Sequence, residues 1–132
     1  MTQEIEQLMS SGNWDAAQAA CQKAIDDHPG NAKLVAYMGL MLFRKNQYEA
    51  ASEYFRKAFV LEPKFWEAGL KLAQCLDRLM RYDEALKVAY EVRGIKQNDA
   101  TLSVLISGLE RQVGTGNADW EKRSHNIYLS DK

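Results

Sequence analysis

The sequence predicts an all-α fold built from stacked helix pairs, and three observations indicate it. Its two prolines, Pro29 and Pro63, lie 34 residues apart. The residue types that precede each proline recur at the same spacing, and a third copy of this pattern follows without its proline. Within each copy, apolar residues recur at intervals of three and four, the spacing of one helix face. One such helix pair cannot bury its apolar face alone, so successive pairs are expected to stack.

Four positions of the pattern recur from copy to copy. Nine residues before an aromatic position stands a small residue, Gly39 in the second copy and Ala73 in the third. We expect these small residues to let the two helices of a pair approach closely, with Gly39 lying near Ala51. The aromatic position holds Trp14, Tyr48 and Tyr82, the first alanine position holds Ala17, Ala51 and Ala85, and the later alanine position holds Ala24, Ala58 and, in larger form, Val92.

The helix boundaries follow from caps and turns. In the second copy Asn31 is a suitable N-cap for a first helix, and Asn46-Gln47 form the turn to a second helix that begins at Tyr48. Pro63 ends that second helix because proline cannot continue the hydrogen-bond ladder. The third copy runs from about Phe65 to Ile95 with a break at Arg81.

This pattern resembles the tetratricopeptide repeat family over roughly residues 2 to 97. The resemblance implies a right-handed superhelix of stacked antiparallel helix pairs, which is an α-solenoid. It also implies a single domain over residues 1–132, with units at about 2–31, 32–65 and 66–97 and a degenerate capping unit at 98–130. The first unit is short, because its first helix is expected only from Thr2 to Ser11, with Ile5 at the small-residue position.

The C-terminal segment looks like a worn fourth unit. Its first helix is expected from Ala100 to Gln112, capped by Asn98 or Asp99, and a looser glycine-containing turn follows. A last helix is expected from Trp120 to about Leu129. Polar terminal helices cap solenoids, so we interpret this segment as a cap, and the alternative that it fills the groove stays open.

The resemblance implies that the first helices of successive units line a concave groove. The run from Leu34 to Phe43 gives an independent reason to expect a binding surface, because it is apolar all the way round and needs cover on every side. Two sides are expected to pack on neighbouring helices, which leaves a third side in the groove with an apolar floor and a basic rim. The predicted partner-binding residues are Lys33, Tyr37, Leu40, Phe43, Arg44, Leu70, Lys71, Gln74, Arg78, Val104 and Leu105.

Two alternatives bear on this groove. The chain could cover the apolar patch itself, through Trp120 and Ile127–Leu129 or by self-association. Some members of the family bind the acidic tails of heat-shock chaperones with a two-carboxylate clamp of Lys, Asn and Arg residues. The corresponding positions here hold Thr2, Glu6, Tyr37, Glu67 and Lys71, of which only Lys71 suits that role, so a chaperone-tail ligand is not expected.

Composition excludes several other classes. A net charge of −1 argues against nucleic-acid binding. Cys21 and Cys75 fall on buried helix faces and are expected to act as small hydrophobes, while His28 and His125 are too few and too scattered for a metal site. The longest apolar stretch, about ten residues, is too short to span a bilayer, and the acidic start does not resemble a signal peptide, so we expect a cytoplasmic protein without membrane insertion.

The sequence therefore predicts a non-catalytic protein-protein interaction module that needs no cofactor. Its groove would bind an extended or helical segment of a partner protein. Two alternatives remain: a cytosolic secretion or assembly chaperone that holds an aggregation-prone subunit, and a self-assembling scaffold.

Overall fold

The computed structural model describes residues 2–114, and every regular element in that range is an α-helix. The predicted last helix, from Trp120 to Leu129, lies outside the described residues. The helices are α1 (Thr2–Ser10), α2 (Trp14–Asp27), α3 (Ala32–Arg44), α4 (Tyr48–Leu61), α5 (Trp66–Arg78), α6 (Tyr82–Ile95) and α7 (Ala100–Gly114).

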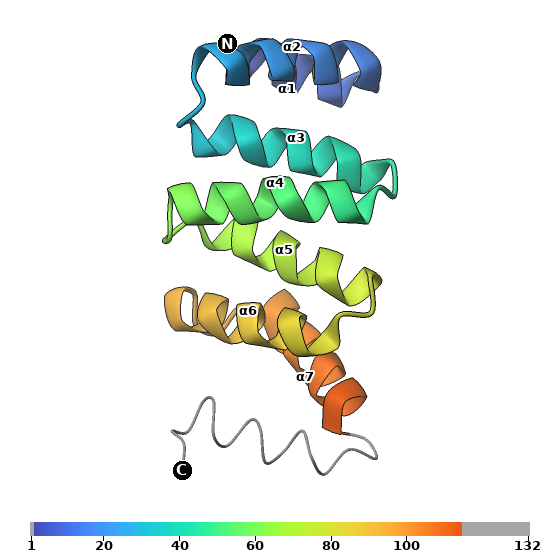
Figure 1. The fold of residues 1–132 in the computed structure, drawn as a ribbon, viewed down its shortest axis with the longest axis vertical. Helices are drawn as coiled ribbons and strands as arrows, with labels where there is room; N and C mark the ends of the chain where they lie inside the picture. Colours follow the sequence, from blue (N-terminus) through green and yellow to red (C-terminus); the bar gives the residue numbers. More distant parts are fainter. Residues whose placement is uncertain (1, 115–132) are drawn as a thin grey trace.

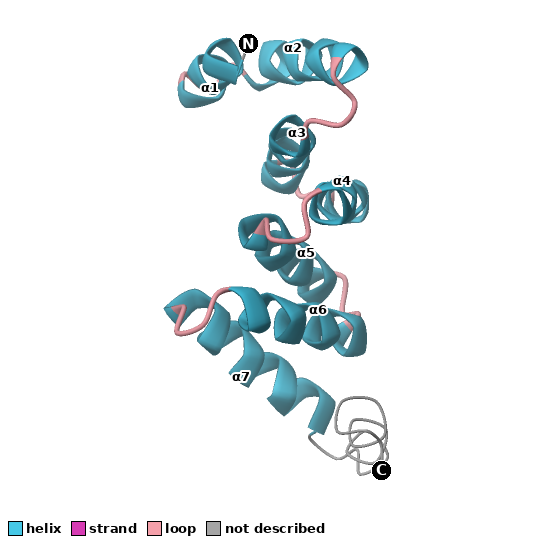
Figure 2. Cartoon of the chain, turned by 90° about the vertical axis from the view of Figure 1, so that its left-hand side faces the viewer, coloured by secondary structure: helices cyan, strands magenta, loops and turns pink. Residues whose placement is uncertain are grey.

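The helices stack in chain order along the long axis of the molecule (Figure 1). Seen from the side, α1, α3 and α5 lie towards one face, and α2, α4 and α6 lie towards the other (Figure 2). Each helix therefore packs mainly on the helices before and after it in the chain, as expected for a solenoid. The predicted all-α stack of helix pairs is confirmed.

Capping residues set the helix starts. The Asn31 side chain accepts hydrogen bonds from the backbone amides of Lys33, at 3.1 Å, and Leu34, at 3.2 Å, which confirms it as the N-cap of α3. At α7 the Asp99 carboxylate accepts from the Leu102 amide at 2.9 Å, so Asp99, and not Asn98, is the cap. These side chains satisfy amides that have no partner within the helix.

The three turns inside the helix pairs share one backbone feature. Gly12, Asn46 and Met80 lie 34 residues apart in sequence and all adopt a positive φ, of 78°, 63° and 62°. Glycine and asparagine tolerate this left-handed region, but methionine rarely occupies it. The turn at Met80 therefore has the same backbone conformation as the turn at Asn46, although methionine is unfavourable in this conformation.

Close packing between the helices depends on two glycines of α3 and α5. A Cβ atom on Gly39 would lie 3.0 Å from ring carbons of Phe55, so this ring packs directly against Gly39. On α5, a Cβ atom on Gly69 would lie 2.6 Å from Cγ2 of Val92 and 2.9 Å from Cζ of Phe59. Gly69 therefore lets α5 pack tightly against both α4 and α6. The repeated alanines Ala17, Ala51 and Ala85 are completely buried, as predicted.

No helix within residues 2–114 combines the length and the apolar character that a bilayer crossing requires.

Candidate partner-binding groove

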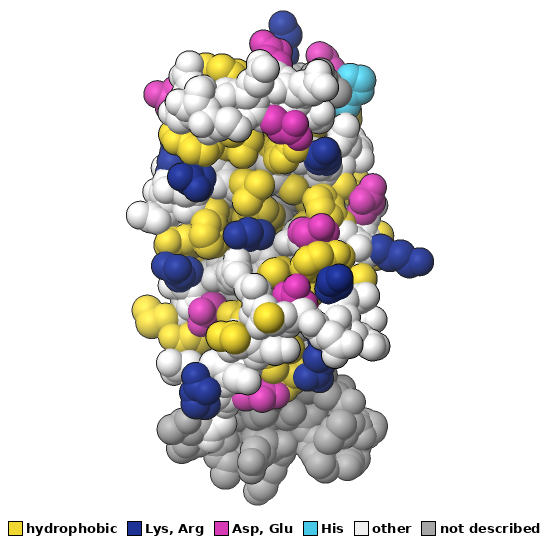
Figure 3. Space-filling view, turned by 180° about the vertical axis from the view of Figure 1, so that it is seen from behind, with side chains coloured by type: hydrophobic (Ala, Val, Ile, Leu, Met, Phe, Trp, Pro, Cys, Tyr) yellow, Lys and Arg dark blue, Asp and Glu magenta, His cyan; other side chains and the backbone are white. Residues whose placement is uncertain are grey.

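The face formed by α1, α3, α5 and α7 carries the candidate site. Figure 3 shows this face, with hydrophobic side chains gathered across its middle and charged side chains of both signs between them. The apolar character of α3 explains the gathering: Tyr37, Leu40 and Phe43 are only partly buried, and they pack against the edge of the core. Within residues 2–114, the side of α3 that carries these three side chains is left partly exposed, as expected.

A pocket of about 500 Å³ lies between α3 and the start of α5, and we call it the α3–α5 pocket. Its apolar lining comes from three successive helices and the connection before α5, so it is built where two repeat units meet. Its charged residues carry both signs. The pocket is lined by Ala36, Tyr37, Leu40, Phe55, Phe65 and Ala68 together with Asn31, Lys33, Glu62, Glu67 and Lys71.

The structure brings four of the predicted site residues together in this pocket, namely Lys33, Tyr37, Leu40 and Lys71. Leu70 was expected as an apolar anchor, but it points into the core and is only 8% exposed, so it offers a partner little surface. Its side chain belongs to the hydrophobic core, and the neighbouring Gly69 packs closely against Val92 and Phe59. Leu70 therefore stabilises the fold instead of lining the pocket.

Two predicted residues of α7 belong to a separate hollow. Val104, which is 73% exposed, and Leu105 line a space of about 580 Å³ between α5 and α7, together with Asp77. Gln74 is half-buried on α5 and lines neither hollow. The predicted groove is thus divided into an α3–α5 pocket and an α5–α7 hollow.

Each of the four cations predicted for the rim lies over an aromatic ring. Lys33 is 5.8 Å from the ring centroid of Tyr37, and Lys71 is 5.1 Å from that of Phe43. The two arginines reach back to the preceding repeat unit. Arg44 lies 4.7 Å from the ring centroid of Trp14, and Arg78 lies 5.6 Å from that of Tyr48. Contacts of this type stabilise by about 0.5–1 kcal/mol at exposed sites. These cations therefore have a structural role beside any role in binding.

Glu6 of α1 contacts two residues that line the pocket, Tyr37 and Lys33. The Tyr37 hydroxyl donates a hydrogen bond to its carboxylate, and the Lys33 ammonium lies 3.7 Å from the same oxygen. Burial, the hydrogen bond to Glu6 and the negative charge of Glu6 raise the pKa of Tyr37 to about 12. The Tyr37 hydroxyl is therefore protonated at neutral pH and already has its acceptor.

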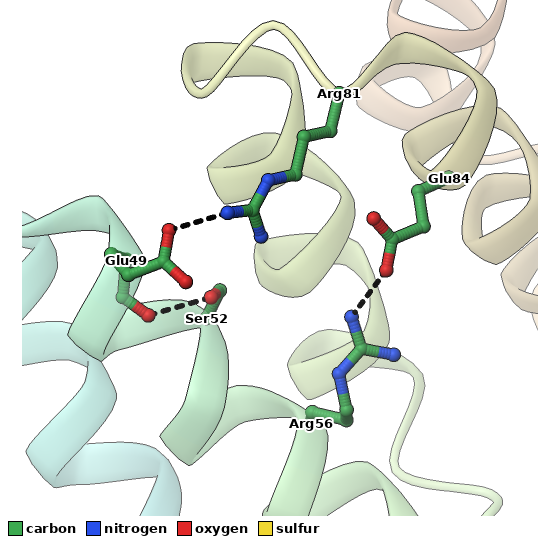
Figure 4. A network of polar contacts seen from close by, with 5 residues as sticks. All are labelled: Glu49, Ser52, Arg56, Arg81 and Glu84. Carbon is green, nitrogen blue, oxygen red and sulfur yellow. Dashed lines mark hydrogen bonds and ion pairs between the residues drawn. The ribbon is translucent and has the colours of Figure 1, made fainter.

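Two ion pairs join the helix pair of α3 and α4 to that of α5 and α6 (Figure 4). Arg81 pairs with Glu49 at 2.7 Å, and Arg56 pairs with Glu84 at 3.0 Å, so both pairs join the α4 unit to the α6 unit. The buried Ser52 hydroxyl donates to the Glu49 carbonyl at 2.7 Å. The ion-paired side chains are about half exposed, and exposed pairs of this kind contribute roughly 0.2–1 kcal/mol each.

Several residues that line the pocket are absent from the predicted partner-binding residues, among them Phe55, Glu62 and Phe65. Phe55 lies on α4, whereas Glu62 and Phe65 lie on either side of Pro63 in the connection before α5. Phe65 occupies the position that Asn31 and Asp99 fill in the neighbouring units, yet its side chain caps nothing. An aromatic residue at a capping position was the signal that could have identified it.

Both cysteines are completely buried, as predicted. The Cys21 thiol donates to the Leu34 carbonyl at 3.2 Å. Burial raises the pKa of Cys21 to about 11 and that of Cys75 to about 12. Because the thiolate is the reactive form, these thiols lack the properties of a nucleophile.

The fold and its repeated positions define this chain as a tetratricopeptide repeat protein. Residues 10–92 match the family described as anaphase-promoting complex, cyclosome, subunit 3, and the chain belongs to that family. It is 26% identical over 105 residues to anaphase-promoting complex subunit 3 of Schizosaccharomyces pombe. The aligned residues cover 80% of this chain and 16% of that protein.

A second relative has a different name. The chain is 33% identical over 73 residues to the probable biofilm formation methyltransferase WspC of Pseudomonas aeruginosa, which covers 55% of this chain and 17% of that protein. The chain thus spans about a sixth of the length of the curated relatives that it matches.

Solved structures share the fold. The first tetratricopeptide domain of Spaghetti (RPAP3) bound to an HSP90 peptide superimposes with a TM-score of 0.82 at 18% identity, covering 86% of this chain and 90% of that one. The Sgt2 domain from Aspergillus fumigatus gives 0.78 at 17% identity, covering 86% and 77%. MamA gives 0.72 at 24% identity, covering 82% and 62%.

Proposed function

We propose that this chain is a non-catalytic protein-protein interaction module that binds an extended or helical segment of a partner protein across the α1, α3, α5 and α7 face. The observation that carries the proposal is the α3–α5 pocket, whose apolar lining of Tyr37, Leu40 and Phe65 is open at the surface. Apolar hollows with a few flanking polar groups are typical binding sites. An apolar side chain of the partner would fill this pocket.

The similar structures support a binding role for this fold. The RPAP3 domain is described as bound to the HSP90 peptide SRMEEVD, which is an acidic tail. We infer that such a tail is not the partner of this chain. Glu6 and Glu67 lie where a peptide carboxylate would need cations, and Tyr37 already donates its hydroxyl to Glu6.

The similarity to WspC does not make catalysis the better proposal. It covers 17% of that protein, so most of the length of that relative has no counterpart in the match. In the part of this chain that the structure describes, both thiols are buried and protonated. We therefore propose that the chain contributes recognition.

The test compares two variants that each place one carboxylate on the surface. Leu40→Glu puts the charge in the α3–α5 pocket, whereas Val60→Glu puts it at a position on α4 that is 71% exposed and does not line the pocket. Wild type and both variants are used as bait in affinity capture with quantitative mass spectrometry, and circular dichroism checks that helicity is retained. A partner protein lost by Leu40→Glu and kept by Val60→Glu supports the proposal.

Equal recovery of every protein by both variants would contradict it. Light scattering of the purified chain over a range of concentrations distinguishes the self-assembling scaffold from a module that binds a separate partner. A mass that rises with concentration, and that falls back to the monomer with Leu40→Glu, would make the groove a contact between copies of this chain.

A further inference from the structure

The charges around the α3–α5 pocket differ from the basic rim that the sequence suggested. Resting on the proposed function, we propose that the pocket selects a partner segment in which an apolar side chain stands beside a Lys or Arg residue. The segment is recognised internally, through its side chains, and not through a terminal carboxylate. Three features of the pocket support this assignment.

The first feature is that the pocket's two cations are already in contact with other groups. Lys33 lies 3.7 Å from the Glu6 carboxylate and also over the ring of Tyr37. Lys71 extends over the ring of Phe43 at 5.1 Å from its centroid. A partner carboxylate would have to compete with Glu6 for Lys33. Binding an anion at Lys33 would therefore disrupt an interaction between α1 and α3.

The second feature is a pair of free carboxylates. Glu62, at the C-terminal end of α4, and Glu67, in the first turn of α5, both line the pocket and are exposed. Neither has an ion-pair partner among residues 2–114. Other glutamates of the described chain, such as Glu49 and Glu84, are paired with arginines. With Lys33 paired to Glu6, the pocket has one cation without an ion pair among residues 2–114, Lys71, against these two carboxylates, so its unbalanced charge is negative.

The third feature is the position of these carboxylates relative to the apolar lining. Phe65 lies between Glu62 and Glu67 in the sequence and lines the same pocket, so apolar surface and negative charge occur on one short segment. A partner side chain that fills the pocket brings its neighbouring residues towards this segment. Complementary charges of this kind contribute more to specificity than to affinity, since exposed pairs are weak individually. The apolar side chain supplies affinity and the adjoining cation supplies selection.

The experiment uses the full chain and three sets of short fluorescent peptides, each blocked at both ends. Every peptide has one central leucine or phenylalanine, and the flanking positions carry Lys and Arg, Gln, or Glu. Affinities are measured by fluorescence anisotropy at low and high salt. We expect the basic set to bind more tightly than the neutral set, by about two- to fivefold for each of the two carboxylates of the pocket. The acidic set should bind most weakly, and the differences between the sets should shrink at high salt.

Charge variants of the chain give the matched comparison. The double variant Glu62→Gln/Glu67→Gln should lose the preference for the basic set, whereas Glu53→Gln should keep it, because Glu53 is exposed on α4 and does not line the pocket. The double variant Glu62→Lys/Glu67→Lys should reverse the order and favour the acidic set. Circular dichroism verifies that each variant keeps its helicity.

Four outcomes of these measurements would overturn the inference. If the acidic set binds best, or if no set binds, the charge assignment is wrong. If Leu40→Glu removes binding while Glu62→Gln/Glu67→Gln changes nothing, the groove function stands and only the charge selection fails. Equal binding by wild type and Leu40→Glu removes both.

The last experiment asks whether the chain's own C-terminal segment binds the pocket. Trp120, Lys122 and Arg123 have the same combination of apolar and basic residues as the proposed partner. In the full-length variant Lys122→Gln/Arg123→Gln, affinity for the basic set should equal that of wild type. A roughly tenfold gain would identify this segment as the occupant of the pocket and would overturn the assignment to a separate partner.

Discussion

The guanidinium of Arg78 lies over the ring of Tyr48, 5.6 Å from its centroid, and thereby joins the end of α5 to the start of α4. The same contact occurs one repeat earlier, between Arg44 and Trp14 at 4.7 Å. Each arginine lies at the end of the first helix of its unit. It contacts the first residue of the second helix in the preceding unit. In the next repeat Gln112 occupies the arginine position opposite Tyr82. The contact is thus a repeated connection between units that α7 lacks.

Removing this connection should reduce stability. We expect Arg78→Gln to lower the free energy of unfolding by about 0.5–1 kcal/mol, because the cation over the ring is lost. Urea denaturation of Arg78→Gln, Tyr48→Leu and the double variant gives the coupling energy. Lys57→Gln serves as the control, since Lys57 is exposed and makes no ion pair or cation–ring contact with the residues that the structure describes. Additive effects of Arg78→Gln and Tyr48→Leu would show that the contact contributes nothing.

Restoring the connection in the last described unit should have the opposite effect. Gln112→Arg places a guanidinium at the repeat position that faces Tyr82, and we expect a gain of about 0.5 kcal/mol in the free energy of unfolding. Hydrogen exchange of the α7 amides provides a local measurement. Protection that does not change in α7 would mean that the repeat register is not maintained there.

The glycine at position 69 is expected to be irreplaceable. A methyl group there would overlap Val92 and Phe59, so Gly69→Ala should destabilise the protein by about 1–3 kcal/mol through overpacking. Gly94 on α6 has no atom within 4 Å of its Cβ position, and Gly94→Ala should instead stabilise by up to about 1 kcal/mol through helix propensity. Thermal and urea denaturation of the two variants should give shifts of opposite sign.

The left-handed backbone at Met80 is expected to reduce stability. An L-residue in this region costs about 1–2 kcal/mol, and the freedom of glycine in the unfolded chain offsets part of the gain, so Met80→Gly should stabilise by about 0.5–1 kcal/mol. Met80→Ala keeps the unfavourable φ and should show no such gain. Similar midpoints for the two variants in urea would argue against strain at this turn.

Alkaline pH should destabilise the fold through its buried thiols. Burial raises the pKa of Cys21 and Cys75 from 9.0 in an exposed thiol to about 11 and about 12. The protonated thiol is therefore favoured in the folded state, and its contribution is complete below about pH 9. As the pH rises towards 11, thiols ionise in the unfolded chain first, and stability falls. Denaturation at pH 8 and pH 10.5 measures the loss, which Cys21→Ala/Cys75→Ala should reduce.

The repeat made the helices predictable, because the positions of Tyr48, Tyr82 and Pro63 mark where second helices begin and end. The apolar side of α3 was predictable for the same reason, since a helix that is apolar all round exceeds what two neighbours can cover. The directions of Lys33 and Lys71 were not predictable, because periodicity does not determine which ring or carboxylate a long side chain contacts. Phe65 was missed because its repeat position holds the capping residues Asn31 and Asp99 in the neighbouring units, so the pattern predicts a helix cap there and not a pocket residue.

The ion pairs of Arg81 with Glu49 and of Arg56 with Glu84 lie on the α4 and α6 side, whereas the α3–α5 pocket opens on the other side. The second and third units are therefore joined on both sides, because Lys71 also lies over the ring of Phe43 on the pocket side. None of the four ion-paired side chains lines the pocket, so a partner side chain can fill the pocket while both ion pairs remain in place.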